Sequence, residues 1–183
     1  KEENYLGFMK DIFAFVLFDH KENTAFCARD RFGEKPFFYS YQPGHSFYFG
    51  SEMKCLWAAG IPKAINHRML FNYLSYGFLE NPEDLSETFY QNCTRLPHAH
   101  CISIQLNTME LRVRRYYDID WTQTREPLSR QDAEARFGEL FYTSIQRRLR
   151  SDVPVGSSLS GGLDSSAVVC VIDQLKKGTS QAQ

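Results

Sequence analysis

The chain has 183 residues and a net charge of −1, from 21 basic and 22 acidic side chains. This length is sufficient for one sizeable hydrophobic core or two small ones, and the near-neutral charge gives no support to a general nucleic-acid-binding role. No apolar run approaches the roughly 18 residues that span a bilayer, and no signal peptide opens the chain, so we expect neither a nucleic-acid nor a membrane partner.

The cysteines indicate reduced thiols. Their number is odd and no CxxC spacing occurs among them, which disfavours a disulfide or zinc framework. They are Cys27, Cys55, Cys93, Cys101 and Cys170. We therefore expect a cytosolic (cytoplasmic) protein. The chain does not begin with Met, which favours its being a piece of a longer protein.

Four short strands are predicted in the first fifty residues. They cover residues 11–19, 24–30, 35–41 and 46–51. The first is apolar on both alternating faces, which is typical of a strand that is covered on both sides. Because short polar turns join the four segments, we expect an antiparallel meander.

Two helices and a hairpin follow. Residues 51–60 favour a short helix with Ser51 as its N-cap, and residues 66–78 favour another that is capped by Asn66. Residues 100–106 and 110–119 flank Asn107-Thr108, which indicates a hairpin.

The composition changes after Tyr117, and we place a linker at residues 118–128, between domains at 1–117 and 129–183. A helix should begin after Ser129, which has Asp132 three residues later as a capping partner, and should end before Pro154. A strand is then expected at 153–160 and a helix at 164–177. Strand, glycine-rich turn and helix in this order are typical of an α/β nucleotide-binding fold.

The turn Ser160-Gly161-Gly162-Leu163-Asp164-Ser165-Ser166 has the chemistry of a phosphate site. Adjacent glycines let an anion approach the main chain, and the first N–H groups of the following helix attract negative charge. The serines add hydroxyl donors. Asp164 would repel phosphate unless it holds Mg²⁺ against the phosphate oxygens.

The alternative interpretation of this turn is a helix N-cap in a flexible serine-glycine loop. The turn is neither a Walker A motif nor the dinucleotide motif, because no lysine follows the glycines and their spacing differs. It resembles the PP-loop, S-G-G-x-D-S, of the ATP pyrophosphatase family. That resemblance implies cleavage of ATP between the α- and β-phosphates, with the pyrophosphate held in this loop.

Four segments in order, "FAFVLFD", "ARDRFGEKPFFYS", "FGSEMKCL" and "SDVPVGSSLSGGLDSS", are similar to the glutamine-hydrolysing asparagine synthetases. The similarity implies an α+β fold. Residues 1–117 would be the antiparallel layered sheet in the C-terminal part of a glutamine amidotransferase type 2 domain of the N-terminal-nucleophile (Ntn) type. Residues 129–183 would provide the first strand and helices of an α/β PP-loop domain, like the adenine nucleotide α-hydrolases.

The same similarity implies a ligase that uses glutamine, aspartate and ATP with Mg²⁺. Such an enzyme makes asparagine through β-aspartyl-AMP, releases AMP and pyrophosphate, and passes ammonia between its domains; a homodimer is possible. Two alternatives stay open. One is a relative that forms another amide, such as a lactam or a cyclised peptide. The other is a non-catalytic fragment that binds phosphate weakly.

The chain also departs from this family. The family's glutaminase nucleophile is an N-terminal cysteine, whereas this chain begins with Lys1 and its cysteines are internal. The Asn-Gly-Glu segment that binds glutamine is missing too, and Asp11-Ile12 replaces a glycine. We therefore assign no catalytic residue and expect an internal fragment without glutaminase activity of its own.

The similarity assigns ATP or pyrophosphate contacts to Leu159, Ser160, Gly161, Gly162, Asp164, Ser165 and Ser166, with Asp164 also at Mg²⁺. Leu159 is equally compatible with core packing. Met53 would lie near the ammonia path, or else in a helix core. Arg29, Asp30 and Glu52 would order the sheet and its contact with the second domain, and Arg29 could pair with Asp30. His98 and His100 near Cys101 fit a solvated segment better than a metal site.

Overall fold

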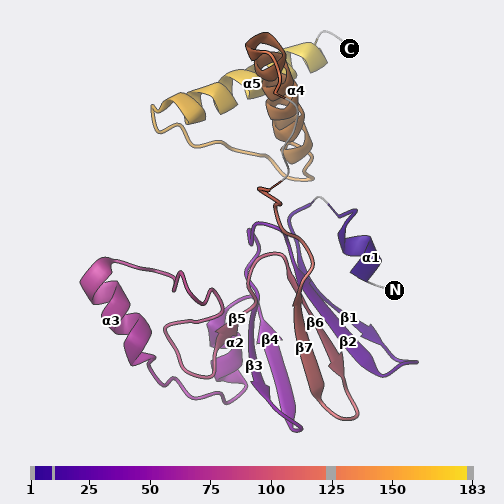
Figure 1. Ribbon diagram of the computed structural model, residues 1–183, viewed down its shortest axis with the longest axis vertical. Coiled ribbons are helices and arrows are strands. Elements are labelled where there is room, and N and C mark those ends of the chain that lie inside the picture. The colour runs from indigo at the N-terminus through magenta and orange to yellow at the C-terminus, as the bar shows by residue number, and fades with distance from the viewer. Residues whose placement is uncertain (1–2, 10, 123–126, 181–183) are drawn as a thin grey trace. The chain divides into compact units, whose positions relative to one another are not determined.

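The computed structural model describes residues 3–9, 11–122 and 127–180. Residues 123–126, which fall within the predicted linker 118–128, lie outside the described residues. The chain divides into two compact units, residues 1–121 and 122–183, and each has its own secondary structure (Figure 1).

The first unit contains two antiparallel sheets. One has the strand order β1-β2-β6-β7, and the other has the order β4-β3-β5. The first sheet is made of β1 (Ala14–Asp19), β2 (Thr24–Arg29), β6 (His100–Gln105) and β7 (Glu110–Arg115), and the second of β3 (Phe38–Gln42), β4 (Ser46–Gly50) and β5 (Thr94–Arg95).

The predicted meander of four consecutive strands is wrong in one respect. β1 pairs with β2 and β3 with β4, but β2 pairs with β6, so that Cys27 lies opposite Ile102. The loop at residues 30–37, here named the 30–37 loop, carries the chain from one sheet to the other. The predicted hairpin is confirmed, because β6 pairs with β7 across Asn107-Thr108.

The principal core lies between the two sheets. Its buried members come from both, and Cys27, Leu96 and Ile102 are completely shielded from solvent. On the other side of the first sheet, Leu6 from the short helix α1 (Glu3–Leu6) packs in a second cluster. A third cluster lies where α2 (Met53–Ala58) meets Phe38 on the outer side of β3. The unit is therefore layered as helix, sheet, sheet and helix.

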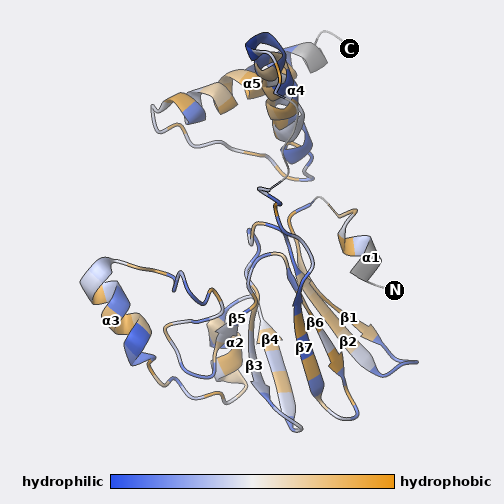
Figure 2. Cartoon of the chain, viewed as in Figure 1, coloured by the Kyte–Doolittle hydropathy of each residue, from blue (hydrophilic) through white to orange (hydrophobic). Residues whose placement is uncertain are grey.

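The first strand is covered over only part of its length. Ala14 and Val16 pack toward the core between the sheets, and Phe15 packs in the second cluster. Leu17 and Phe18, however, are 51% and 54% exposed. Figure 2 shows the apolar residues along β1, β2 and β6. The prediction of cover on both sides thus holds for the beginning of β1 and is wrong for its end.

A polar side chain caps α3 (His67–Tyr76), whereas no side chain caps α2. Asn66 caps α3 by accepting hydrogen bonds from the backbone N–H groups of Arg68 and Met69, as predicted. The predicted cap at Ser51 is wrong. The residue before α2 is Glu52, and its side chain makes no capping hydrogen bond.

The second unit has two helices, α4 (Arg130–Arg148) and α5 (Leu163–Ser180). The Ser129 cap is confirmed, because its Oγ accepts from the Asp132 N–H at 3.1 Å and donates to the Asp132 carboxylate at 2.6 Å. The segment expected as a strand, 153–160, has no regular secondary structure. A parallel strand needs a neighbour to complete its hydrogen bonds, and the described part of this unit offers only helices. No described helix is long and apolar enough to cross a membrane.

Candidate phosphate-binding loop and its surroundings

Residues 160–162 of the predicted phosphate loop lie directly before α5, and residues 163–166 belong to the start of that helix. Gly161 has a φ of +80°, a left-handed conformation that glycine adopts without strain. The helix then begins at Leu163, with Asp164 in its first turn. The chain therefore reverses immediately in front of a helix N-terminus.

The serine hydroxyls hold this turn together. The Oγ atoms of Ser160 and Ser165 are 3.0 Å apart, and the Ser165 Oγ also donates to the Gly162 carbonyl at 3.1 Å. The Ser166 Oγ donates to the same carbonyl at 2.8 Å. The structure thus brings Ser160, Gly162, Ser165 and Ser166 together within one turn.

The donor set of the turn fits a phosphate group. The first N–H groups of a helix have no partner within it and carry partial positive charge, and the hydroxyls of the turn can reorient toward an anion. The fit to Mg²⁺ rests on one carboxylate, because no described group of three or more acidic, histidine or cysteine residues could hold a metal ion. Asp164 alone would suit an ion that takes its remaining ligands from phosphate and water.

The apolar residues of the loop face solvent. Leu159 is 62% exposed and Leu163 is 87% exposed, so neither packs in a core within this chain. The hollow of about 490 Å³ in the second unit is lined by Leu149, Val153 and Leu175. Leu175 lies 12 residues after Leu163, about 18 Å further along α5, so this hollow is not part of the phosphate loop.

Arg29 and Asp30 do not bind each other, in contrast to the predicted pair. The Arg29 guanidinium donates to three carbonyl groups, those of Lys35 at 2.6 Å, Gly33 at 2.6 Å and Leu96 at 2.7 Å. Two of these acceptors belong to the 30–37 loop, and the third fixes this loop to the segment after β5. Arg29 therefore orders the 30–37 loop by binding its main chain, whereas the prediction was that it orders the sheet and its contact with the second domain.

The Asp30 carboxylate binds the N–H groups of the same loop. Its Oδ1 accepts from Phe32 at 3.1 Å and Glu34 at 3.0 Å, and its Oδ2 accepts from Lys35 at 3.0 Å. Burial alone would raise the pKa of this carboxyl group, but the backbone hydrogen bonds outweigh burial and hold its pKa below the usual value. This arrangement was not predicted from the sequence, although adjacent opposite charges before a glycine turn are a weak signal for it.

Replacing Gly33 with alanine should destabilise the chain by about 2–3 kcal/mol, because it combines backbone strain with a clash. Gly33 has a φ of +70°, and an added Cβ would lie 3.0 Å from the Arg29 Nη2 and 3.1 Å from the His98 Cβ. Urea unfolding measures the change. Gly44→Ala is the matched control, since its φ is +69° but nothing lies within 4 Å of an added Cβ. Equal losses for the two variants would contradict the clash.

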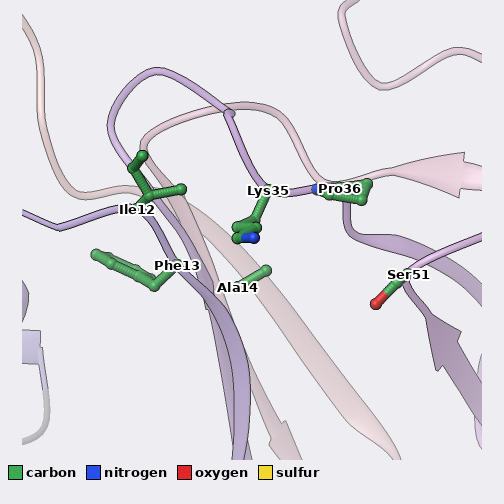
Figure 3. A pocket seen from close by; sticks show the side chains of 6 residues that line it. All are labelled: Ile12, Phe13, Ala14, Lys35, Pro36 and Ser51. Atoms are coloured by element: carbon green, nitrogen blue, oxygen red, sulfur yellow. The ribbon is translucent and has the colours of Figure 1, made fainter. Parts of the chain in front are cut away.

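A hollow of about 480 Å³ opens beside the start of β1 (Figure 3). It is lined by Ile12, Phe13, Ala14, Lys35, Pro36 and Ser51. Met53, the predicted ammonia-path residue, lies two residues beyond Ser51 at the start of α2. Its side chain is partly buried against the cluster of Leu56, Ile61 and Cys93. Glu52, between them, forms an exposed ion pair with Lys54 at 2.6 Å.

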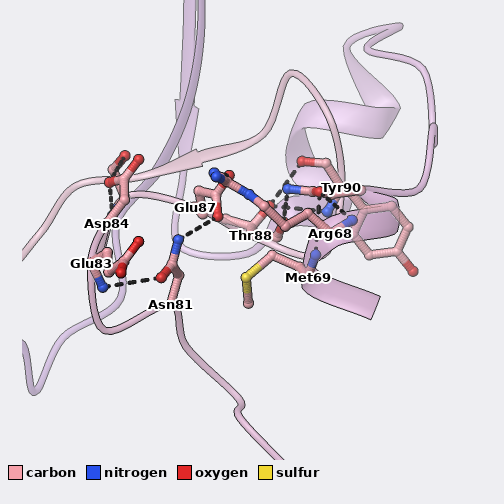
Figure 4. A network of polar contacts seen from close by, with 10 residues as sticks. Arg68, Met69, Asn81, Glu83, Asp84, Glu87, Thr88 and Tyr90 are labelled. Atoms are coloured by element: carbon pink, nitrogen blue, oxygen red, sulfur yellow. Dashed lines mark hydrogen bonds and ion pairs between the residues drawn. The ribbon is translucent and has the colours of Figure 1, made fainter. Parts of the chain in front are cut away.

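The acidic segment after α3, residues 80–88, makes hydrogen bonds and an ion pair that hold it in place (Figure 4). Glu87 binds Arg68 of α3 and accepts from the Asn81 amide at 2.8 Å. The buried Thr88 hydroxyl donates to the Cys93 carbonyl at 2.6 Å. These contacts hold the segment in its own fold and against α3.

The two histidines near Cys101 contact each other through the main chain of His98. The His100 Nδ1 lies 2.7 Å from the His98 carbonyl oxygen.

Two of the buried cysteines, Cys27 and Cys93, are poor nucleophiles. Burial, together with the neighbouring Cys101, raises the pKa of the Cys27 thiol to about 12, and burial also raises the pKa of Cys93. Since the thiolate is the reactive form, these groups stay unreactive at neutral pH. None of the five cysteines, all of which are described, forms a disulfide bond.

Two protein families match this chain. Residues 3–117 match the glutamine amidotransferase domain family, and residues 136–182 match the asparagine synthase family. The first match alone covers more than half of the chain.

Curated relatives match along almost the whole chain. A putative asparagine synthetase [glutamine-hydrolyzing] 2 of Methanocaldococcus jannaschii is 36% identical over 92% of this chain and 33% of its own length. Asparagine synthetase [glutamine-hydrolyzing] 3 of Bacillus subtilis is 34% identical over 93% of this chain and 26% of its own length. Amidase chyE of Penicillium rubens is 28% identical over 96% of this chain and 25% of its own length. The chain thus spans a quarter to a third of these relatives.

Proposed function

We propose, from the premise that this chain belongs to the family of glutamine-hydrolysing asparagine synthetases, that it is part of an ATP-dependent ligase that makes asparagine from aspartate and glutamine. The observation that supports this most is the serine-glycine turn at residues 160–166, which leads into the start of α5. Its hydroxyls, its left-handed Gly161 and the helix N-terminus form a donor set suited to pyrophosphate.

In this proposal each residue of the loop has a defined task. The hydroxyls of Ser160, Ser165 and Ser166 donate to phosphate oxygens, after they give up their present partners within the turn. Gly161 and Gly162 leave room for the anion beside the main chain, and Leu159 borders the nucleotide. Asp164 would hold Mg²⁺, which neutralises phosphate charge when it is bound.

Several finer assignments belong to the same proposal. We place the amidotransferase part at residues 1–117, a linker at 118–128 and the synthetase part at 129–183. Met53 would border the ammonia path, and its partly buried side chain leaves some surface available for this. The five cysteines, none of which forms a disulfide bond, support a reducing, cytosolic location. The parent enzyme would act without nucleic acid or membrane partners, and we propose a homodimer.

A second candidate function is the formation of another amide. The relative named amidase chyE, which is 28% identical along 96% of this chain, supports this second candidate. Both candidates use the same phosphate loop, because activation of a carboxylate by ATP is common to them. They differ in the carboxylate that is activated and in the nitrogen nucleophile, ammonia or an amine, that attacks it.

The test is to express the complete reading frame that includes this chain and to assay it with glutamine, ATP, Mg²⁺ and different carboxylates. We expect asparagine and one equivalent of pyrophosphate with aspartate. As a control, Asp164→Asn should abolish pyrophosphate release and leave glutamate release from glutamine intact. Another amide accumulating in place of asparagine would exclude the first candidate.

A further inference from the structure

We propose that the hollow beside the start of β1 binds a small aliphatic carboxylate, and that the Lys35 ammonium group is its counter-ion. The site includes Ala14, the first residue of β1, and Phe13 directly before it. Lys35 and Pro36 of the 30–37 loop and Ser51, directly after β4, also line it. Figure 3 shows the Lys35 side chain above Ala14, with Ile12 and Phe13 to its left and Ser51 to its right. The inference goes beyond the proposed function and does not depend on the phosphate loop.

The first argument is that the fold fixes the main chain of Lys35 at both polar atoms. Its N–H donates to the Asp30 Oδ2 at 3.0 Å, and its carbonyl accepts from the Arg29 Nε at 2.6 Å. Both partners are buried, with 2% of Asp30 and 9% of Arg29 exposed. The next residue is Pro36, whose ring restricts the backbone further. Two buried charged groups thus position one exposed lysine.

The second argument is that the Lys35 ammonium is available. Among the described residues it makes no hydrogen bond or ion pair, whereas Lys54 binds Glu52 and Lys177 binds Asp173. An exposed lysine on a flexible loop would often be unpaired, but this loop is not free to move because Arg29 and Asp30 bind its main chain. A lysine whose main chain is held in place and whose ammonium has no partner needs less ordering to bind an anion than one on a mobile loop.

The third argument concerns the walls of the hollow. Its volume of about 480 Å³ is within the range of small-molecule sites. No acidic residue is among its six lining residues, so the field of Lys35 is not cancelled there. Ile12, Phe13 and Pro36 provide apolar surface, and the Ser51 hydroxyl provides one more donor. An ammonium, a hydroxyl and apolar walls match a carboxylate with a short hydrocarbon stem.

The experiment is a titration of the ¹⁵N-labelled chain with butyrate, followed through backbone amide shifts, with butyramide as the uncharged probe of equal shape. We expect saturable butyrate shifts at Ala14, Lys35 and Ser51, and much weaker shifts with butyramide. Lys35→Ala should weaken butyrate binding at least about tenfold, the usual cost of a charged hydrogen bond. Lys35→Arg should restore most of the binding.

The matched control is Lys21→Ala. Lys21 is also exposed in a turn and has its N–H bound by an aspartate side chain, but it is not among the residues that line the hollow. Its removal should leave butyrate binding unchanged. Equal shifts with butyrate and butyramide, or equal losses in the two alanine variants, would overturn the site. The titration contains no phosphate, so its outcome is separate from that of the phosphate loop.

Discussion

Replacing Asp30 with asparagine is expected to lower the free energy of unfolding by about 2–4 kcal/mol at pH 7. The asparagine oxygen can replace Oδ1 and accept from Phe32 and Glu34, but its NH₂ group would face the Lys35 N–H, which Oδ2 now binds at 3.0 Å. Two donors would then meet at a site that is 2% exposed. Urea unfolding of the two proteins measures the difference.

The difference should depend on pH in a defined direction. The pKa of Asp30 is lowered in the folded chain, because its hydrogen bonds with the backbone outweigh the effect of burial. Its contribution is therefore fully present above the unfolded pKa of about 3.9 and disappears as the pH falls through the lower folded value. We expect the gap between wild type and Asp30→Asn to be constant from pH 5 upward and to narrow below about pH 4.

Asp19→Asn is the control for this variant. Both of its backbone hydrogen bonds, from Lys21 at 2.8 Å and Glu22 at 3.1 Å, reach the single atom Oδ1 and are exposed. An asparagine can keep both, so the change should stay within about 0.5 kcal/mol. Equal effects of the two substitutions would contradict the role assigned to the Asp30 carboxylate.

Replacing Gly161 with valine is expected to weaken pyrophosphate binding to the chain at least about tenfold. The φ of Gly161 is +80°, and a β-branched residue in this conformation costs roughly 1–2 kcal/mol or more. The turn would therefore shift and separate the Ser160 and Ser165 hydroxyls, now 3.0 Å apart. Isothermal titration with pyrophosphate at low ionic strength measures the loss.

Gly156→Val is the matched control for this substitution. Gly156 lies in the segment before the loop, its φ is not in the left-handed range, and nothing lies within 4 Å of an added Cβ. Its pyrophosphate affinity should match that of the unaltered chain. Loss of affinity in both variants would indicate a general effect of valine in this segment.

Features that depend on neighbours in sequence could be predicted. The caps at Asn66 and Ser129 are local hydrogen bonds over two or three residues, and both are present. The pairing of β2 with β6 could not be predicted in this way, because Cys27 and Ile102 are 75 residues apart and hydrophobic periodicity does not identify a strand's partner. The exposure of the end of β1 could not be predicted for the same reason, since periodicity shows which faces of a strand are apolar and not what covers them.

The phosphate loop and the surroundings of Lys35 also differ in whether they depend on neighbours in sequence. The phosphate loop is contiguous, so a phosphate site could be predicted from residues 160–166 alone, and it stays a prediction. The role of Arg29 was not, because one of its acceptors, the Leu96 carbonyl, comes from a distant segment. The free Lys35 ammonium could not be predicted either, since it depends on which side chains the fold places around it.

The most direct test of the central claim, that residues 160–166 form a pyrophosphate site, is a titration of the unaltered ¹⁵N-labelled chain with pyrophosphate. We predict saturable amide shifts at Gly161, Gly162, Asp164 and Ser165, larger than those caused by sulfate at equal ionic strength. Shifts confined to other residues, or identical shifts with sulfate, would contradict the claim.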